Sequence, residues 1–221
     1  MKHVHPRPVH RSRALPGPPR ALGEAAWHLP GFALPWVEGL YPELLAVRAQ
    51  APLRQLSTPG GGRMSVGTTS CGALGWVSDA RGYRYTPYDP ENGQPWPAMP
   101  ALFAELAREA ASAAGFEGFA PDACLINHYR PGAGMGLHQD RDERDLRAPI
   151  VSVSLGIAAV FLRGGHQRSD KPQRIALAHG DVVVWGGVDR LRFHGVLPLA
   201  PATHPRLGAR RINLTFRQAR A

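Results

Sequence analysis

The chain has 221 residues and a formal net charge of +9, with 43% hydrophobic and 19% charged residues. That length suits one substantial domain and is enough to bury a hydrophobic core. No apolar run approaches the roughly 20 residues that a membrane-spanning helix needs, and residues 1–20 lack the apolar segment of a secretory signal. We therefore expect a soluble cytoplasmic protein without a membrane segment, and we expect it to be a monomer.

The cysteines and the distribution of charge narrow the class further. Cys71 and Cys124 are too few for a disulfide framework, and they do not form the Cys-x-x-Cys pair of a thiolate zinc site. Residues 1–20 hold five cations and no acid, so the rest of the chain carries +9 − 5 = +4. We expect residues 1–22 to be a disordered basic tail rich in Pro and Arg, and residues 23–221 to form one domain. A basic tail attracts phosphate regardless of sequence, although a solubilising arm is the simpler interpretation.

Helical and strand patterns alternate with turns in the first half of the chain. An amphipathic helix is predicted at residues 38–50, where Leu40 and Leu44 recur at helical spacing. An alanine-rich helix is predicted at residues 99–114, with Gly115 placed to end it. Between the helices the sequence predicts, in chain order, a turn at 58–62, short strands at 65–77 and 83–85, and a proline-rich loop at 89–100.

The second half of the chain has short strand patterns separated by turn residues, without helical patterns between them. Such a succession indicates an antiparallel sandwich or barrel rather than βαβ units. A jelly roll of about eight strands fits it, so the predicted fold class is α+β, mainly β. The strands are predicted at 123–129, 150–156, 159–163, 174–177, 181–185, 192–196 and 211–217.

His138, Asp140 and His194 are the first candidate site. His138 and Asp140 stand two residues apart, so an extended chain directs both side chains to one face. Two imidazoles and one carboxylate on one side of a metal are the facial triad of non-haem Fe(II) oxygenases, which leaves other positions open. However, a His-x-Asp pair is common in surface loops, and His194 is one of ten histidines. The residues alone leave a metal site and a coincidence both open.

The predicted strand at 211–217 is the second candidate. With a period of two, one face carries polar and the other apolar residues: Arg211, Asn213, Thr215 and Arg217 against Ile212, Leu214 and Phe216. The polar face can simply meet solvent, as on an edge strand. Inside a jelly roll, however, two guanidiniums need anionic partners, and the arginine fork suits a carboxylate. Two arginines beside a metal therefore suggest a ligand with two carboxylates. Asn127 and Tyr129 repeat the spacing on another strand, although a structural tyrosine is the simpler interpretation.

Ordered blocks along the chain resemble the AlkB family of Fe(II)- and 2-oxoglutarate-dependent dioxygenases, which repair alkylated nucleobases. In the second half the blocks are CLINHYRPGA from Cys124, LHQDRDE from Leu137, DLRAPIVSVSLG from Asp145, HGDVVVWGG from His179 and NLTFRQ from Asn213. In the first half they are TPGG from Thr58, MSV from Met64, CGALGW from Cys71 and the proline-rich segment at 89–100. The resemblance runs from about Trp27 to Gln218 and is far more specific than a His-x-Asp pair.

The resemblance implies a fold and a set of ligands. The fold is a double-stranded β-helix (jelly roll) catalytic core at about residues 121–221, preceded at about residues 23–120 by supporting helices and a nucleotide-recognition lid. The implied Fe(II) ligands are His138, Asp140 and His194. The implied 2-oxoglutarate ligands are Arg211 and Tyr129 at the distal carboxylate, and Asn127, Asn213 and Arg217 at the end that chelates iron.

The resemblance also implies a substrate and a reaction. The implied substrate-binding residues are Trp76 and Tyr83 in the lid, Asp142 at the polar edge of the base and Arg168 on the substrate strand, with Thr58 and Tyr85 as weaker lid candidates. The implied reaction demethylates bases of the 1-methyladenine and 3-methylcytosine type with O2 as cosubstrate, releasing formaldehyde, succinate and CO2. A flipped or single-stranded base needs such stacking and edge contacts.

The implied partner is alkylated single-stranded DNA, with double-stranded DNA or RNA as further substrates to test. An RNA or tRNA demethylase or hydroxylase of the same reaction class is one alternative, and a non-enzymatic jelly-roll protein that binds metal and nucleic acid is another. Three positions depart from the family pattern: Gly134 and Gly136, where larger residues that help contact the nucleic-acid backbone are expected, and Thr68, where a larger apolar lid residue is expected. These departures concern the substrate and the fit of the lid, not the chemistry.

Overall fold

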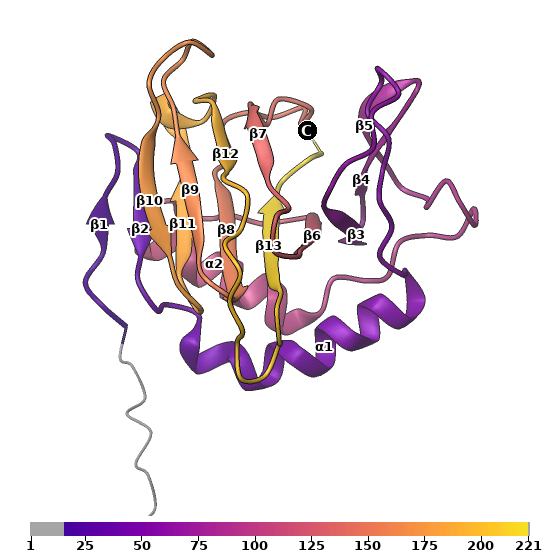
Figure 1. Ribbon diagram of the computed structural model, residues 1–221, viewed down its shortest axis with the longest axis horizontal. Helices are drawn as coiled ribbons and strands as arrows, with labels where there is room; N and C mark the ends of the chain where they lie inside the picture. Colours follow the sequence, from indigo (N-terminus) through magenta and orange to yellow (C-terminus); the bar gives the residue numbers. More distant parts are fainter. Residues whose placement is uncertain (1–15, 221) are drawn as a thin grey trace, which may run out of the picture.

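The computed structural model describes residues 16–220, which form two β-sheets, a separate hairpin and two α-helices (Figure 1). Residues 1–15, most of the predicted tail, lie outside the described residues. Within residues 16–220, neither helix has the length and apolar content that crossing a membrane requires.

Two antiparallel sheets form the body of the protein. The larger sheet has seven strands in the order β1-β2-β11-β8-β13-β6-β3, and the smaller has four in the order β10-β9-β12-β7. The strands of the larger sheet are β1 (Arg20–Ala21), β2 (Ala26–Leu29), β3 (Gly67–Gly72), β6 (Ala123–Tyr129), β8 (Ile150–Gly156), β11 (Val182–Trp185) and β13 (Arg211–Arg217). Those of the smaller sheet are β7 (Met135–His138), β9 (Ala159–Arg163), β10 (Gln173–Leu177) and β12 (His194–Val196). Every pairing is antiparallel, as the sequence predicted.

The two sheets pack face to face as a jelly roll, which confirms the predicted fold class. Val183 and Trp185 of the larger sheet share one apolar cluster with Phe161 and Val196 of the smaller sheet. The hairpin of β4 (Gly75–Asp79) and β5 (Gly82–Thr86) stands apart from both sheets beside β3 (Figure 1). Its residues Trp76 and Tyr83 line the cavity of the jelly roll.

The outer face of the larger sheet is covered by two helices, α1 (Val37–Gln50) and α2 (Ala101–Ala113) (Figure 1). The apolar side of β13 packs against them, because Leu214 and Phe216 belong to one buried cluster with Leu40 and Phe103. Phe103 meets Phe216 edge to face, with ring centroids 6.1 Å apart. This packing turns the polar side of β13 toward the interior of the jelly roll, so its guanidiniums do not face solvent.

Most predicted elements are confirmed. The strands predicted at 123–129, 150–156, 159–163 and 211–217 agree with β6, β8, β9 and β13 at both ends, and those of β10, β11 and β12 agree to within two residues. Both predicted helices form. Gly115, with φ +84°, ends α2, because its N–H and that of Phe116 reach back to the carbonyls of Ser112 and Ala111.

Three strands were not predicted, and one boundary differs. β1, β2 and β7 have no strand pattern of their own: β1 has two residues, and β2 and β7 have four each. β1 pairs with β2 and lies inside the segment expected as a disordered tail, so the described fold begins before residue 23. The short strands predicted at 65–77 are β3 and β4, and the chain turns between them at Gly72, which has φ +119°.

Candidate active site

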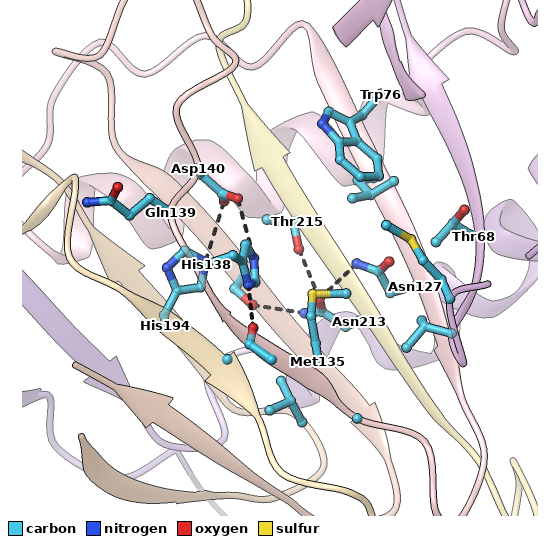
Figure 2. A pocket seen from close by; sticks show the side chains of 18 of the residues that line it. Thr68, Trp76, Asn127, Met135, His138, Gln139, Asp140, His194, Asn213 and Thr215 are labelled. Carbon is cyan, nitrogen blue, oxygen red and sulfur yellow. Dashed lines mark hydrogen bonds and ion pairs between the residues drawn. The ribbon is translucent and has the colours of Figure 1, made fainter. Parts of the chain in front are cut away.

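His138, Asp140 and His194 meet where two strands of the smaller sheet end. His138 closes β7 and His194 opens β12, and the two residues are paired across these strands. One ligand atom from each of the three side chains lies within 4.8 Å of the other two. His138 Nε2 is 3.6 Å from Asp140 Oδ1, and His194 Nε2 is 3.7 Å from Asp140 Oδ2 (Figure 2). The structure thus brings the three predicted metal ligands together.

Both imidazoles aim Nε2 at the same point because Nδ1 already has a partner. His138 Nδ1 lies 2.9 Å from the Gly136 carbonyl oxygen, and His194 Nδ1 lies 3.1 Å from that of Arg192. A carbonyl oxygen only accepts, so each Nδ1 carries the proton and each Nε2 keeps a lone pair. Burial, followed by the charge of His138, lowers the pKa of His194 to about 4. A neutral imidazole with a free Nε2 is the form that binds a transition metal.

Asp140 supplies the negative charge of the cluster. Burial disfavours its ionised form, but Arg217, followed by His194 and His138, holds the pKa of Asp140 well below its ordinary range. Arg217 donates to Asp140 Oδ2 from Nη2 at 2.6 Å and from Nε at 3.1 Å. The carboxylate is therefore ionised and fixed. Two imidazoles and one carboxylate, all on one side of a small space, fit Fe(II) with open positions for other ligands.

Glu143 and Arg190, to which the sequence gave no role, extend this network. Glu143 Oε2 accepts from Arg190 Nη2 at 3.0 Å, and its Oε1 lies 3.1 Å from Arg217 Nε. The hydroxyl of Tyr85 on β5 donates to Glu143 Oε1 at 2.7 Å. Burial raises the pKa of Tyr85 well above its ordinary value, so the hydroxyl remains a donor. A chain of buried contacts thus joins the β4–β5 hairpin to Asp140.

Arg211 is buried, with 1% of its surface exposed. Its Nη2 donates to Ser154 Oγ at 2.8 Å, and its guanidinium carbon lies 5.0 Å from the centroid of the Tyr129 ring. Among residues 16–220, its Nε and Nη1 have no hydrogen-bond partner. Burial lowers the pKa of Arg211, which reflects the cost of an unpaired charge in this place. These unpartnered nitrogens leave the guanidinium with donors available to a carboxylate group of a dicarboxylic acid.

Asn127 and Asn213 are paired across β6 and β13 between the metal ligands and Arg211. Asn213 is held by the protein, because its Nδ2 donates to Ser152 Oγ at 2.8 Å and its Oδ1 accepts from Thr215 Oγ1 at 2.9 Å. Asn127 Nδ2 lies 3.4 Å from Asn213 Oδ1, and Asn127 Oδ1 has no partner within the described part of the chain. Asn127 therefore keeps hydrogen-bonding capacity toward the cavity (Figure 2).

A single cavity of about 580 Å³ contains every site residue that the sequence analysis assigned to metal, cosubstrate or substrate. Thr58, a weaker lid candidate, also lines the cavity. Tyr85 does not line it, and its hydroxyl group instead contacts Glu143. A volume of this size suits a cosubstrate and one further ring system together. Arg211 and Asp140 are buried in the inner wall of this cavity. Figure 2 shows Asp140 beside His138 and His194, with Trp76 apart from the two imidazoles.

The β4–β5 hairpin supplies an aromatic surface to this cavity. The rings of Trp76 and Tyr83 are stacked, with centroids 5.5 Å apart and planes 11° from parallel. The indole Nε1 of Trp76 donates to Asp142 Oδ2 at 2.8 Å, so the hairpin is tied to the loop that follows β7. On the other side of the opening, the guanidinium carbon of Arg168 lies 5.9 Å from the centroid of the Phe193 ring.

Known proteins are similar to this chain in sequence and in fold. The sequence profile described as the 2OG-Fe(II) oxygenase superfamily matches residues 30–217. The "Alpha-ketoglutarate-dependent dioxygenase AlkB" of Salmonella typhimurium is 56% identical over 198 residues, which cover 90% of this chain and 92% of that protein. This chain belongs to the AlkB family of 2-oxoglutarate- and Fe(II)-dependent oxygenases. It is accordingly an enzyme, a dioxygenase that uses Fe(II), 2-oxoglutarate and O2.

More distant relatives of this AlkB-family chain agree with that assignment. The "Nucleic acid dioxygenase ALKBH1" of Mus musculus is 36% identical over 136 residues, covering 60% of this chain and 33% of that protein. A solved structure described as "The structure of OsALKBH1" has a TM-score of 0.79 and 29% identity, covering 91% of this chain and 100% of that one. The jelly roll predicted from the sequence is therefore the fold of the family.

The three positions where the sequence analysis expected larger residues, Thr68, Gly134 and Gly136, all line the cavity. A Cβ at Gly134 would lie 2.8 Å from the backbone nitrogen of Pro198, so this position excludes a side chain unless β7 moves. A Cβ at Gly136 would have no atom within 4 Å, so this position is open. Thr68 lines the cavity and is 3% exposed, which makes it part of the wall. Packing therefore does not require a glycine at position 136.

Proposed function

We propose that this AlkB-family enzyme removes methyl groups from N-alkylated nucleobases of the 1-methyladenine and 3-methylcytosine type, with single-stranded DNA as its preferred substrate. In this proposal it acts as a monomer and releases formaldehyde, succinate and CO2. The observation that carries the proposal is the position of the Trp76–Tyr83 stack and Asp142 around the same cavity as His138, Asp140 and His194. The mouse relative is named a nucleic acid dioxygenase, which supports a nucleic-acid substrate.

The lining of the cavity suits a flat heterocycle with polar edges. A base that is taken out of a stack loses its neighbours, and aromatic side chains replace them. Trp76 and Tyr83 offer such π-faces from the hairpin. Asp142 is a hydrogen-bond acceptor beside them, which suits the exocyclic amino group of adenine or cytosine. Trp76 holds this carboxylate in place while no base is present.

The residues of the inner wall bind and orient the cosubstrate. Arg211, whose Nε and Nη1 have no partner among the described residues, would take the distal carboxylate beside Tyr129. Asn127 and Arg217 would serve the end near His138 and His194, although Arg217 also holds Asp140. When bound, Fe(II) with 2-oxoglutarate and O2 supplies the oxidation that places a hydroxyl group on the N-methyl carbon. The hydroxylated base then loses formaldehyde.

A formaldehyde-release assay tests the proposal. The full chain is incubated with Fe(II), 2-oxoglutarate, O2 and oligonucleotides that carry 1-methyladenine or 3-methylcytosine, as single-stranded DNA, duplex DNA or RNA. We expect fastest release from single-stranded DNA. Fastest release from RNA would instead establish the RNA demethylase alternative. Intact methylated bases in every arm, with metal and 2-oxoglutarate shown to be bound, would leave only a protein that binds and does not turn over.

Trp76→Ala should lower kcat/KM for a methylated oligonucleotide by roughly 5- to 150-fold, because one base–aromatic stack contributes about 1–3 kcal/mol. Trp76→Phe keeps a ring and loses only the hydrogen bond to Asp142, so it should retain most of this activity. The KM for 2-oxoglutarate should stay within twofold in both variants, because Arg211 is untouched. An equal loss of kcat/KM in the two variants would mean that activity depends on the hydrogen bond from Trp76 to Asp142 and not on stacking against the base.

Gly136→Lys should strengthen binding of single-stranded oligonucleotides at the cavity opening. The position is exposed and has room for a side chain, and one added phosphate contact should steepen the slope of log Kd against log salt by about 0.7. Fluorescence anisotropy measured at salt concentrations from about 50 to 200 mM gives this slope. Gly134→Lys is the matched variant. It should lower the melting temperature instead, because its Cβ meets the Pro198 backbone.

A further inference from the structure

Four basic side chains gather on the side of the larger sheet that faces away from the catalytic cavity. Asn127 and Tyr129 line the cavity, so His128 between them points to the opposite face of β6. The position of a Cβ at Gly67 is 3.9 Å from Cβ of both His128 and Leu53, and Leu53 follows the end of α1. His128 therefore lies beside the C-terminal end of α1.

Three arginines from three segments lie close enough to His128 for their charges to act on its imidazole. Arg48 belongs to the last turn of α1. Arg211, the first residue of β13, is paired with Tyr129, the last residue of β6. Arg210 and Arg130 are the next residues outward on the two strands. By strand alternation, Arg130 continues the face of His128. The loop that leads into β13 lies against α1, because the guanidinium carbon of Arg206 is 4.2 Å from the centroid of the Tyr41 ring (Figure 1).

Two polar atoms of this cluster are buried without a partner. Within residues 16–220, Nε of Arg48 and Nε2 of His128 are shielded from solvent and form no hydrogen bond. Buried polar atoms in native proteins are almost always satisfied, and an apparent exception commonly marks a bound water or ion. The negative end of the α1 dipole favours a cation at position 48 but supplies no acceptor to this Nε. What each of these two atoms lacks is an acceptor oxygen.

The positive charge of the cluster is not balanced by acids. No ion pair of the described residues involves Arg48, Arg130 or Arg210, whereas Arg206 in the same region pairs with Glu38. Burial, then Arg210, Arg48 and Arg130, lower the pKa of His128 to about 4, and no carboxylate opposes them. At pH 7 the site therefore presents three fixed charges and one neutral imidazole that can donate.

We propose that Arg48, His128, Arg130 and Arg210 form a second, non-catalytic site that binds a phosphate group. A tetrahedral oxyanion offers several acceptors to guanidiniums that converge from different directions, and its charge suits a cluster of three cations. The site lies across the sheet from Arg211, so its ligand does not compete with 2-oxoglutarate. The phosphate belongs either to a small phosphorylated molecule or to the backbone of a nucleic acid beyond the base in the cavity.

Titration calorimetry with inorganic phosphate tests the site in the full chain. 2-Oxoglutarate is present throughout so that the cavity arginines are occupied, and sodium chloride of equal ionic strength is the reference. We expect saturable binding that weakens about tenfold or more in Arg48→Gln/Arg130→Gln, because two charge-assisted hydrogen bonds are lost. Arg108→Gln/Arg174→Gln removes the same charge from exposed positions and should bind phosphate as the wild type does. Binding that is absent, or equally weak in all three proteins, means an adventitious ion only and overturns the proposal.

A second measurement uses the wild-type protein, so its result does not depend on whether a variant folds. The imidazole NMR signals of His128 should shift saturably with phosphate and not with chloride, and unmoved signals would contradict the site. An unmethylated oligonucleotide then separates the two sources of phosphate. Weaker oligonucleotide binding by Arg48→Gln/Arg130→Gln than by the control assigns the site to a nucleic-acid backbone, and equal binding assigns it to a small phosphorylated ligand. None of these readouts depends on turnover, so the site and the proposed demethylation succeed or fail separately.

Discussion

Asp140→Asn should reduce formaldehyde release to the background of the metal-free reaction. Asp140 is the only carboxylate of the three candidate metal ligands, and an amide is a far weaker donor to Fe(II) than a carboxylate. The loss should exceed the roughly 10- to 100-fold that changing an outer partner of a metal ligand costs. Iron retention, measured by equilibrium dialysis, should fall in parallel, because only the two imidazoles remain to bind the metal strongly.

The asparagine also changes the surroundings of Arg217. Its amide oxygen still accepts a hydrogen bond, and Glu143 stays 3.1 Å from Arg217 Nε, so the guanidinium keeps one ionic partner and the chain should remain folded. Asp145→Asn is the matched control. It breaks an ion pair with Arg147 whose arginine is 92% exposed, and such pairs contribute little. Activity of Asp140→Asn within tenfold of wild type would show that Asp140 is not a metal ligand.

The sequence predicts the strands of the core well because their two faces differ in chemistry. β13 alternates strictly, and its apolar face packs on the helices while its polar face lines the cavity. β8 is buried along its whole length, with Ser152 and Ser154 between its apolar residues, and its last residue is Gly156, which has a φ of +101°. For such elements the local pattern and the tertiary packing demand the same structure.

The missed strands have no such agreement. β7 carries Gly136 and ends at His138, and its pairing with β12 has an irregular register. Its extended form is imposed by β12 and by the site, because neither its residues nor their spacing favour a strand. β2 has four residues, and it forms because β11 offers an edge to which Ala26–Leu29 can pair. A pattern in one segment cannot reveal an edge that a distant segment supplies.

Some residues of the candidate site could likewise be predicted from the sequence, and others could not. A metal and a dicarboxylic acid restrict the residue types that can bind them, which made His138, Asp140, His194 and Arg211 candidates. Their roles were then implied by the resemblance to the AlkB family. Glu143 was missed, although it stands in the quoted LHQDRDE block, because its role exists only through Arg190 and Tyr85, which are distant in sequence. Long-range partners of a buried carboxylate leave no local pattern, so only the folded structure identifies them.

Arg211→Met should raise the KM for 2-oxoglutarate by roughly 30- to 5,000-fold, because losing the partner of a buried carboxylate costs about 2–5 kcal/mol. The KM for the methylated oligonucleotide should change little, since Trp76 and Tyr83 are untouched. Arg211→Lys keeps the charge but presents one ammonium in place of a fork, so its KM should lie between those of wild type and Arg211→Met. A KM for 2-oxoglutarate within threefold of wild type in Arg211→Met would exclude Arg211 as the carboxylate ligand.

The same variant should be more stable than the wild type when no ligand is present. In the ligand-free protein, Arg211 is 1% exposed and two of its N–H groups have no partner among the described residues, so its charge opposes folding. Methionine fills similar volume without a charge and should raise the melting temperature. Added 2-oxoglutarate should then stabilise the wild type and leave Arg211→Met unchanged. Thermal melts of both proteins with and without 2-oxoglutarate separate this from a packing defect, because a defect would lower the melting temperature of the variant in both conditions.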